Sequence, residues 1–279
     1  MKRKLFCEIC PLTYKISLLK EYFIYDLKDI INKTKFSKKI STEKLPVIIK
    51  GHSSQILRML NGVDINLQHN KAKNLKLAGD RINCIIIKSG QTFSFWKLVG
   101  KPLAKKGYLD GLTISKGAVG KNIGGGLCQL ANLIHWLVLH SPMEVVELHH
   151  HTDALFPDSN RRVPFGTGTS VFYKHIDYRF KNNTNLPVQL IIWQSEGYLC
   201  GELRSTQKFE YKYQITEENH GFVEENGEYF RVSQIYRLVF DNDKQIVKKE
   251  LILNNHSKVM YDYSLIPKEE IMYTSRQIN

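Results

Sequence analysis

Long apolar runs are missing from this sequence of 279 residues. The longest, IIIKSGQTFSFW and NLIHWLVLH, are short and interrupted, whereas a membrane-spanning helix needs about 20 apolar residues. Charged residues break the basic start, MKRKLFCEICPLTYKISLLKEYF, which lacks the roughly 7–15 apolar residues of a secretory signal. The sequence therefore predicts a cytoplasmic protein without a transmembrane segment. Peripheral contact of a basic N-terminal helix with an anionic surface is an alternative.

Cysteine is scarce, with five residues at positions 7, 10, 84, 128 and 200. An odd, sparse count does not describe a secreted disulfide scaffold. Cys7 and Cys10 form a CxxC pair, but one pair without a second pair or nearby histidines is weak support for zinc. We expect local packing there, with metal binding or redox chemistry as the alternatives. No cofactor and no metal site is predicted for the chain.

Nucleic-acid recognition motifs are also missing: there is no Cys/His finger spacing and no aromatic–glycine strand motif. The net charge is nevertheless +13, from 40 Lys and Arg against 27 Asp and Glu. A basic balance favours anionic partners such as nucleic acid, acidic lipid or a wall polymer. Without a motif, a well-solvated basic surface is the simpler interpretation, so no specific nucleic-acid partner is predicted.

Apolar periodicity predicts an α+β fold. Helices are expected at about 14–32, at about 68–80 ending at Gly79, and at 127–140, where apolar positions cover nearly all faces and indicate a buried helix. Repeated strand patterns separated by turn signals run from 169 to 263, so the C-terminal third is expected to be antiparallel β. The proposed division is an N-terminal helix and basic linker (1–50), a core domain (51–204) and a β-rich extension (205–279).

The sharpest local feature is a run of three glycines, Gly124, Gly125 and Gly126, shortly before a cysteine that opens the buried helix. A helix N-terminus presents free N–H groups and the positive end of the dipole. We therefore expect a lowered pKa for the Cys128 thiol. The glycine N–H groups and Gln129 would bind substrate and a developing oxyanion.

Histidines follow one strand later, after MEVVEL. If the strand continues, His149 and His151 share one face and His150 points the other way. The predicted nucleophile–base pair is Cys128 with His151, or failing that His149. The third, orienting group could be any of three carboxylates: Asp153, Asp158 or Asp177.

Two other interpretations of these residues stay open. A cysteine opening an apolar helix is often a small buried hydrophobe, and histidines in a strand can be hydrogen-bonded structural groups. A zinc site formed by Cys128 and the histidines is also possible. A phosphate loop is excluded, since Cys-Gln stands where Lys-Ser/Thr would follow the glycines.

Three long motifs resemble the VanW-like family, named after an accessory protein of glycopeptide (vancomycin) resistance. They are NLKLAGDRINCIIIKSGQTFSFWKLVG, then GYLDGL with IGGGLCQLANLIHWLVLHSP, then VELHHHTDALFPDSNRRVPFGTGTSVFYKHIDYRFKNNTNLPVQL. They span about Asn74 to Arg204 in the family's order. The opening LFCEICPLTYK also resembles the family's N-terminus. The strands after about Ser205 lie outside this resemblance.

The resemblance implies a role linked with the bacterial cell wall, and the family's motif carries over to the glycines, Cys128, Gln129 and His151. One expectation is a Cys–His enzyme for acyl transfer or hydrolysis of a peptidoglycan-related or small peptide compound. The other is a non-catalytic accessory protein that binds a cell-wall precursor or a protein partner. Many relatives carry an aspartate in the strand after the histidine block, where this sequence has Gly168. A full Cys-His-Asp triad is therefore in doubt.

Overall fold

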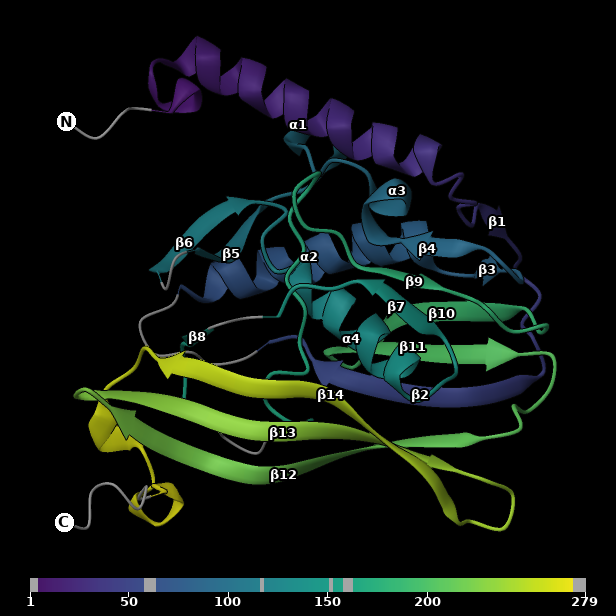
Figure 1. Ribbon diagram of the computed structural model, residues 1–279. Helices are drawn as coiled ribbons and strands as arrows, with labels where there is room; N and C mark the ends of the chain where they lie inside the picture. The colour runs from purple at the N-terminus through teal and green to yellow at the C-terminus, as the bar shows by residue number, and fades with distance from the viewer. Residues whose placement is uncertain (1–4, 58–63, 116–117, 151–152, 158–162, 273–279) are drawn as a thin grey trace.

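A computed structural model describes residues 5–57, 64–115, 118–150, 153–157 and 163–272 (Figure 1). Helices and mainly antiparallel sheets are mixed, as the α+β prediction requires. Across the described residues, every helix is too short or too polar to cross a bilayer.

The central layer is a five-stranded antiparallel sheet in the order β1-β3-β10-β11-β2. Its strands are β1 (Lys39–Ile40), β3 (Ile85–Ile87), β10 (Val188–Ser195), β11 (Tyr198–Ser205) and β2 (Val47–Gln55). The hairpin between β10 and β11 turns at Glu196 and Gly197, both with positive φ, which suits a tight two-residue turn. β1 and the start of β2 come from the predicted linker, and they join this sheet.

Two helices, α2 (Ile65–Ile82) and α4 (Cys128–Leu139), pack on one face of this sheet (Figure 1). α4 is buried along most of its length, as its apolar sequence predicts. α2 does not end at Gly79 as predicted. A Cβ at Gly79 would lie 3.2 Å from Ile192 Cγ2, so the glycine allows close helix–sheet contact inside the helix.

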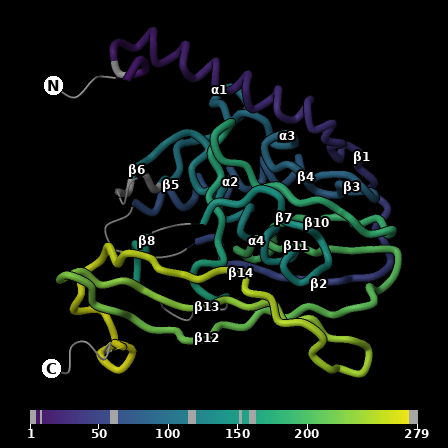
Figure 2. Tube along the Cα trace, viewed as in Figure 1, coloured from purple at the N-terminus to yellow at the C-terminus, as the bar shows by residue number. Residues whose placement is uncertain are grey.

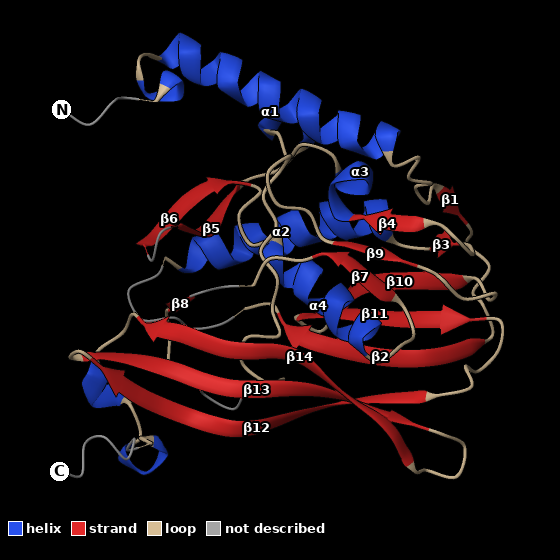
Figure 3. Ribbon diagram, viewed as in Figure 1, coloured by secondary structure: helices blue, strands red, loops and turns tan. Residues whose placement is uncertain are grey.

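A smaller sheet has the order β4-β9-β7, and Figure 3 draws it close to α3. It consists of β4 (Thr92–Ser94), β9 (Arg179–Lys181) and β7 (Glu144–Glu147), and α3 (Phe95–Val99) follows β4 directly. The hairpin of β5 (Asp110–Ser115) and β6 (Ala118–Ile123) leads into the glycine run. Only the end of the predicted strand SVFYKHIDYRF forms β9, because a tight turn closed by Phe172 and Ile176 precedes it.

The C-terminal third is a separate antiparallel sheet of three long strands, as predicted. These are β12 (Lys212–Glu225), β13 (Glu228–Phe240) and β14 (Ile246–Val259), with the short β8 (Asp153–Ala154) pairing parallel to β14. A small apolar cluster of Phe222, Val259 and Ile266 stabilises its end. Figure 2 shows the chain running from the N-terminal helix on one side to this sheet on the opposite side.

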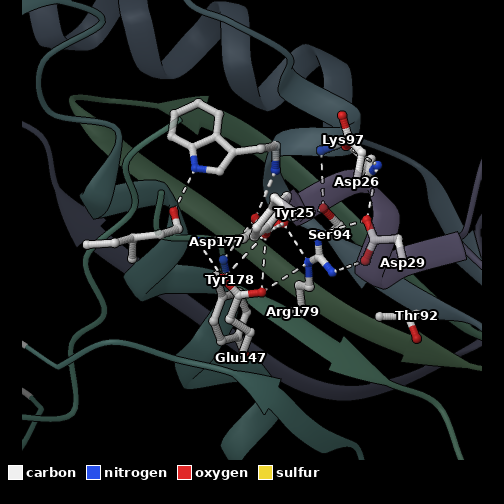
Figure 4. Close-up of polar contacts among 12 residues, drawn as sticks. Tyr25, Asp26, Asp29, Thr92, Ser94, Lys97, Glu147, Asp177, Tyr178 and Arg179 are labelled. Atoms are coloured by element: carbon white, nitrogen blue, oxygen red, sulfur yellow. Dashed lines mark hydrogen bonds and ion pairs between the residues drawn. The ribbon is translucent and has the colours of Figure 1, made fainter. Parts of the chain in front are cut away.

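The N-terminal helix α1 (Pro11–Ile31) docks through a buried polar cluster (Figure 4). The Arg179 guanidinium contacts the Asp29 carboxylate, with Nη1 2.5 Å from Oδ1. The Tyr25 hydroxyl donates to Glu147 and to Asp177. Cys10 caps the helix together with Thr13, whose hydroxyl accepts from the Cys10 N–H, consistent with local packing of the CxxC segment.

Candidate functional site

Cys128 is the first residue of α4, and its side chain is partly buried against the central core. Its Sγ lies 4.0 Å from the carbonyl oxygen of Val171. Burial raises the pKa of the Cys128 thiol above its ordinary value. The expected lowering is therefore wrong for this arrangement, because loss of solvation outweighs the helix N-terminus.

Close packing explains the glycine run. A Cβ on Gly125 would overlap the backbone of Gly111 on β5, and one on Gly126 would overlap the aliphatic stem of Lys71. Gly124 has a positive φ of 80°, and a Cβ there would lie 2.6 Å from Pro102. The structure thus requires glycine at these positions independently of any ligand.

Most of the expected oxyanion donors are already hydrogen-bonded. The Gly124 N–H donates to Leu109 O and the Gly125 N–H to Asn122 O, both at 2.9 Å. Gln129 Nε2 donates to the Ser54 hydroxyl and to Gln55 O, also at 2.9 Å. Within the described part of the chain, the Gly126 N–H meets no hydrogen-bond acceptor. Of the four donors that the sequence predicts for the oxyanion, Gly126 is therefore the one without an acceptor among the described residues.

β7 ends at Glu147, so His149 and His150 lie beyond the strand and not within it. His149 is exposed, and its carbonyl accepts from the Ser170 N–H at 2.8 Å. His150 turns inward, where Nδ1 donates to the carbonyls of Gly166 and Gly168 at 2.8 and 3.2 Å. His151 lies outside the described residues.

The segment 166–171 joins the histidines to the cysteine face of α4. Asn132, one turn after Cys128, accepts from the Thr169 N–H at 2.7 Å. Two residues along the segment, Val171 O faces Cys128 Sγ. His149 pairs with Ser170 between them. One short segment therefore contacts Cys128 through Val171 and His149 through Ser170.

His135 completes this face of α4. Its ring is fully buried, and Nδ1 lies 3.1 Å from the Tyr178 hydroxyl. Desolvation, with a contribution from His150, lowers the pKa of His135 to about 3. Sequence reasoning missed Asn132, His135 and His150. The helical spacing of Asn132 and His135 from Cys128, four and seven residues, could have placed them on one face.

Comparison with known proteins gives the same family as the sequence motifs. The family described as VanW like protein matches residues 70–204. The Vancomycin B-type resistance protein VanW of Enterococcus faecalis (strain ATCC 700802 / V583) is 28% identical over 227 residues, 81% of this chain and 82% of that protein. Over residues 70–204 the chain is therefore similar to the VanW-like family.

A second similar protein is the Uncharacterized protein YoaR of Bacillus subtilis (strain 168), 27% identical over 150 residues, which cover 54% of this chain and 46% of that protein. No solved structure matches the chain. The family match begins within α2 and ends in β11, so it includes Cys128 and the segment 166–171. The sheet β12–β14 lies beyond it.

The carboxylates weighed as a third group differ in their surroundings in this VanW-like fold. Asp177 is 1% exposed and accepts from the Ser94 hydroxyl, the Trp96 N–H and Arg179 Nε (Figure 4). Through these hydrogen bonds, Asp177 is part of the buried polar cluster that holds α1. Asp153 lies in β8, and Asp158 falls outside the described residues.

A metal centre finds no support in the described part of this VanW-like chain, where no three His, Cys, Asp or Glu side chains gather closely enough to hold an ion. Gln129 donates to Gln55 O, and the next residue, Ile56, lines a recess of about 300 Å³. Its lining residues are Ile56, Leu57, His69, Ala72, Gln194, Ser195, Glu196 and Gly197.

Proposed function

We propose that this VanW-like protein is an acyl-transfer or hydrolytic enzyme in which Cys128 is the nucleophile. The observation that supports this most directly is the segment 166–171. Its Val171 carbonyl touches Cys128 Sγ, while its Ser170 N–H binds the backbone of His149. A nucleophilic cysteine with a histidine within reach is the arrangement that covalent acyl transfer requires.

The proposed reaction has two steps, formation of a thioester and its resolution. Cys128 Sγ attacks the carbonyl carbon of an amide, its thiol proton passes to a histidine, and that histidine protonates the leaving amine as the C–N bond breaks. Water or an acceptor amine then attacks the thioester carbonyl and gives a proton to the histidine, which passes it to Cys128 Sγ as the C–S bond breaks. The Gly126 N–H, which has no acceptor among the described residues, would donate to the oxyanion of both tetrahedral intermediates.

A base is needed because the raised pKa of Cys128 leaves the thiol protonated at neutral pH. His151 is our first assignment for this base and His149 the second, as the sequence predicts. His149 is exposed, so approach of its ring to the thiol requires a change of rotamer or of the loop. Segment 166–171 would have to move slightly for a substrate to reach Cys128 Sγ.

The proposed substrate is a peptide of a cell-wall compound. Support comes from the name of the Enterococcus relative, which associates that protein with vancomycin resistance. The net charge of +13 also favours anionic wall precursors over neutral peptides. The cytoplasmic location stays a prediction of the sequence.

The test uses the purified full-length chain and an acylated lysyl-D-alanyl-D-alanine peptide as the probe. Intact-mass spectrometry should detect a thioester adduct in the wild type and none in Cys128→Ala. His151→Ala should slow adduct formation more than His149→Ala, whereas Cys84→Ala serves as the matched control and should react normally. An adduct that persists in Cys128→Ala would remove the cysteine from the mechanism.

The second candidate function is binding of a cell-wall precursor without turnover. The burial of Cys128 and the hydrogen bonds already made by Gly124, Gly125 and Gln129 favour it. Calorimetry with the same peptide would then give equal affinity for wild type and Cys128→Ala, and no adduct would form. Absence of binding and of adducts would reject both functions for this ligand class.

A further inference from the structure

Helix α1 exposes an apolar stripe to solvent along nearly its whole length. Six side chains at helical spacing are between 39% and 71% exposed. They are Leu12, Ile16, Leu19, Phe23, Leu27 and Ile30. Successive spacings of three and four residues place them on one face, which rises about 27 Å along the helix axis. Exposed apolar faces of this size mark interaction surfaces.

The protein-facing side of α1 is the polar one, the reverse of an ordinary surface helix. Asp29 pairs with Arg179 and Asp26 pairs with Lys97 (Figure 4). Asp26 also pairs with Lys174. The acidic groups of the helix near its C-terminal end are thus neutralised by the body of the protein. Docking of α1 therefore leaves the apolar stripe uncovered.

Lysines flank the stripe on both sides. Lys15 lies four residues before Leu19, and Lys20 lies four residues after Ile16, and both are exposed. Glu21 lies on the side of the helix away from the stripe, by the same spacing rule. Further exposed lysines at 33, 35, 38 and 39 follow the helix. The surface around the stripe is therefore basic.

We infer that α1 binds in the headgroup region of an anionic lipid bilayer, lying in its plane with the stripe buried among the acyl chains. An apolar face bordered by lysines is the chemistry of an in-plane helix, and the basic border complements acidic lipids. A second copy of the chain fits less well. In a pair of α1 helices Lys15 and Lys20 would line the contact, and the acidic residue beside the stripe, Asp26, is already paired with Lys97 and Lys174.

Vesicle binding by the full chain tests this surface. We compare phosphatidylcholine vesicles with and without phosphatidylglycerol, using Leu19→Glu/Phe23→Glu as the stripe variant. The matched control is Ile246→Glu/Leu251→Glu, which changes two equally exposed apolar residues on β14. Wild type and control should bind the anionic vesicles, and the stripe variant should lose at least about tenfold in affinity.

Insertion has its own readout. Phe23→Trp keeps the stripe apolar and should give a blue-shifted emission with anionic vesicles, quenched by brominated acyl chains. The inference would be overturned if the wild-type chain did not bind anionic vesicles, or if the β14 control lost as much binding as the stripe variant. So would a dimer in light scattering that the stripe variant disrupts without any vesicle binding. Adduct formation at Cys128 with a water-soluble peptide is a separate readout, which loss of the stripe should leave unchanged.

Discussion

The Asp29 carboxylate and the Arg179 guanidinium meet at two points, Nη1 to Oδ1 at 2.5 Å and Nη2 to Oδ2 at 3.3 Å, across 150 positions of sequence. Both side chains are nearly buried. The arginine also contacts Asp177 and Glu147. Burial alone would lower the pKa of Arg179, but the hydrogen bonds to Asp29 and Asp177 raise it. This pair joins α1 to the sheet that carries β7 and β9.

Removal of Asp29 should therefore loosen α1 before it affects the rest of the fold. For Asp29→Ala we expect a loss of about 2 kcal/mol, because a buried guanidinium loses one partner but keeps two. That equals about a thirtyfold fall in the hydrogen-exchange protection of α1 amides. The control Lys76→Ala breaks the exposed pair with Asp80 and should change stability by under about 0.5 kcal/mol. Unchanged protection in Asp29→Ala would contradict the role of the pair.

Thiol reactivity should separate two cysteines by their surroundings. Burial raises the pKa of Cys128, whereas hydrogen bonds from Thr13 lower the pKa of the exposed Cys10. Alkylation followed peptide by peptide against pH should give a higher midpoint for Cys128, and at pH ~7.5 a rate at least about tenfold lower. A Cys128 midpoint below that of Cys10 would show that the thiolate is stabilised after all.

Acid should destabilise the fold through His135. Its folded-state pKa of about 3 lies below the unfolded value of about 6.5. As the pH falls below 6.5, the His135 ring takes up a proton in the unfolded chain but stays neutral in the folded chain. Stability is therefore full above that pH, and it falls by up to about 1.4 kcal/mol per pH unit toward pH 3. His140, with a pKa lowered to about 4 by burial, adds to this slope.

Urea unfolding between pH 6 and pH 4.5 measures the effect. His135→Gln removes the titrating ring, so the pH slope of the free energy of unfolding should decrease by about one proton. His69→Gln is the control, because that ring is exposed in the folded chain. An equal slope in wild type and His135→Gln would mean that His135 is protonated in the folded state.

Local patterns in the sequence predicted those elements whose structure depends on their own residues. The apolar run after Cys128 gives a buried helix, and Asn226-Gly227 gives a hairpin with positive φ at both residues. Gly79 lies inside α2 and packs on Ile192, which is more than a hundred residues away in the sequence. No local signal therefore sets the end of α2. The strand pattern continues into His149, but the backbone there bonds to Ser170 instead of a strand partner.

The candidate site likewise has one part that local sequence predicts and one part that depends on distant residues. Its nucleophile, Cys128, and the glycines before it stand together in the sequence, and the helix start follows from them. The Gly124 N–H donates to Leu109 O, just before β5, and Gln129 donates to Ser54 on the distant strand β2. The cluster around Asp177 unites four segments of the chain. Such tertiary contacts decide which groups stay open for a ligand, and no single segment contains that information.

Gly125 gives the sharpest test of the packing that holds the cysteine loop. Its Cα faces the backbone of Gly111, and Asn74 Nδ2 donates to its carbonyl at 3.0 Å. Gly125→Ala must push two backbones apart, so we expect a loss of about 3 kcal/mol in urea unfolding. Gly51→Ala is the control, since a Cβ there would lie 3.9 Å from Gly201 O and should change stability by less than about 1 kcal/mol. Equal stability of both variants would mean that the loop can move away from β5, and the fixed position of the Gly126 N–H beside Cys128 would then no longer follow from packing.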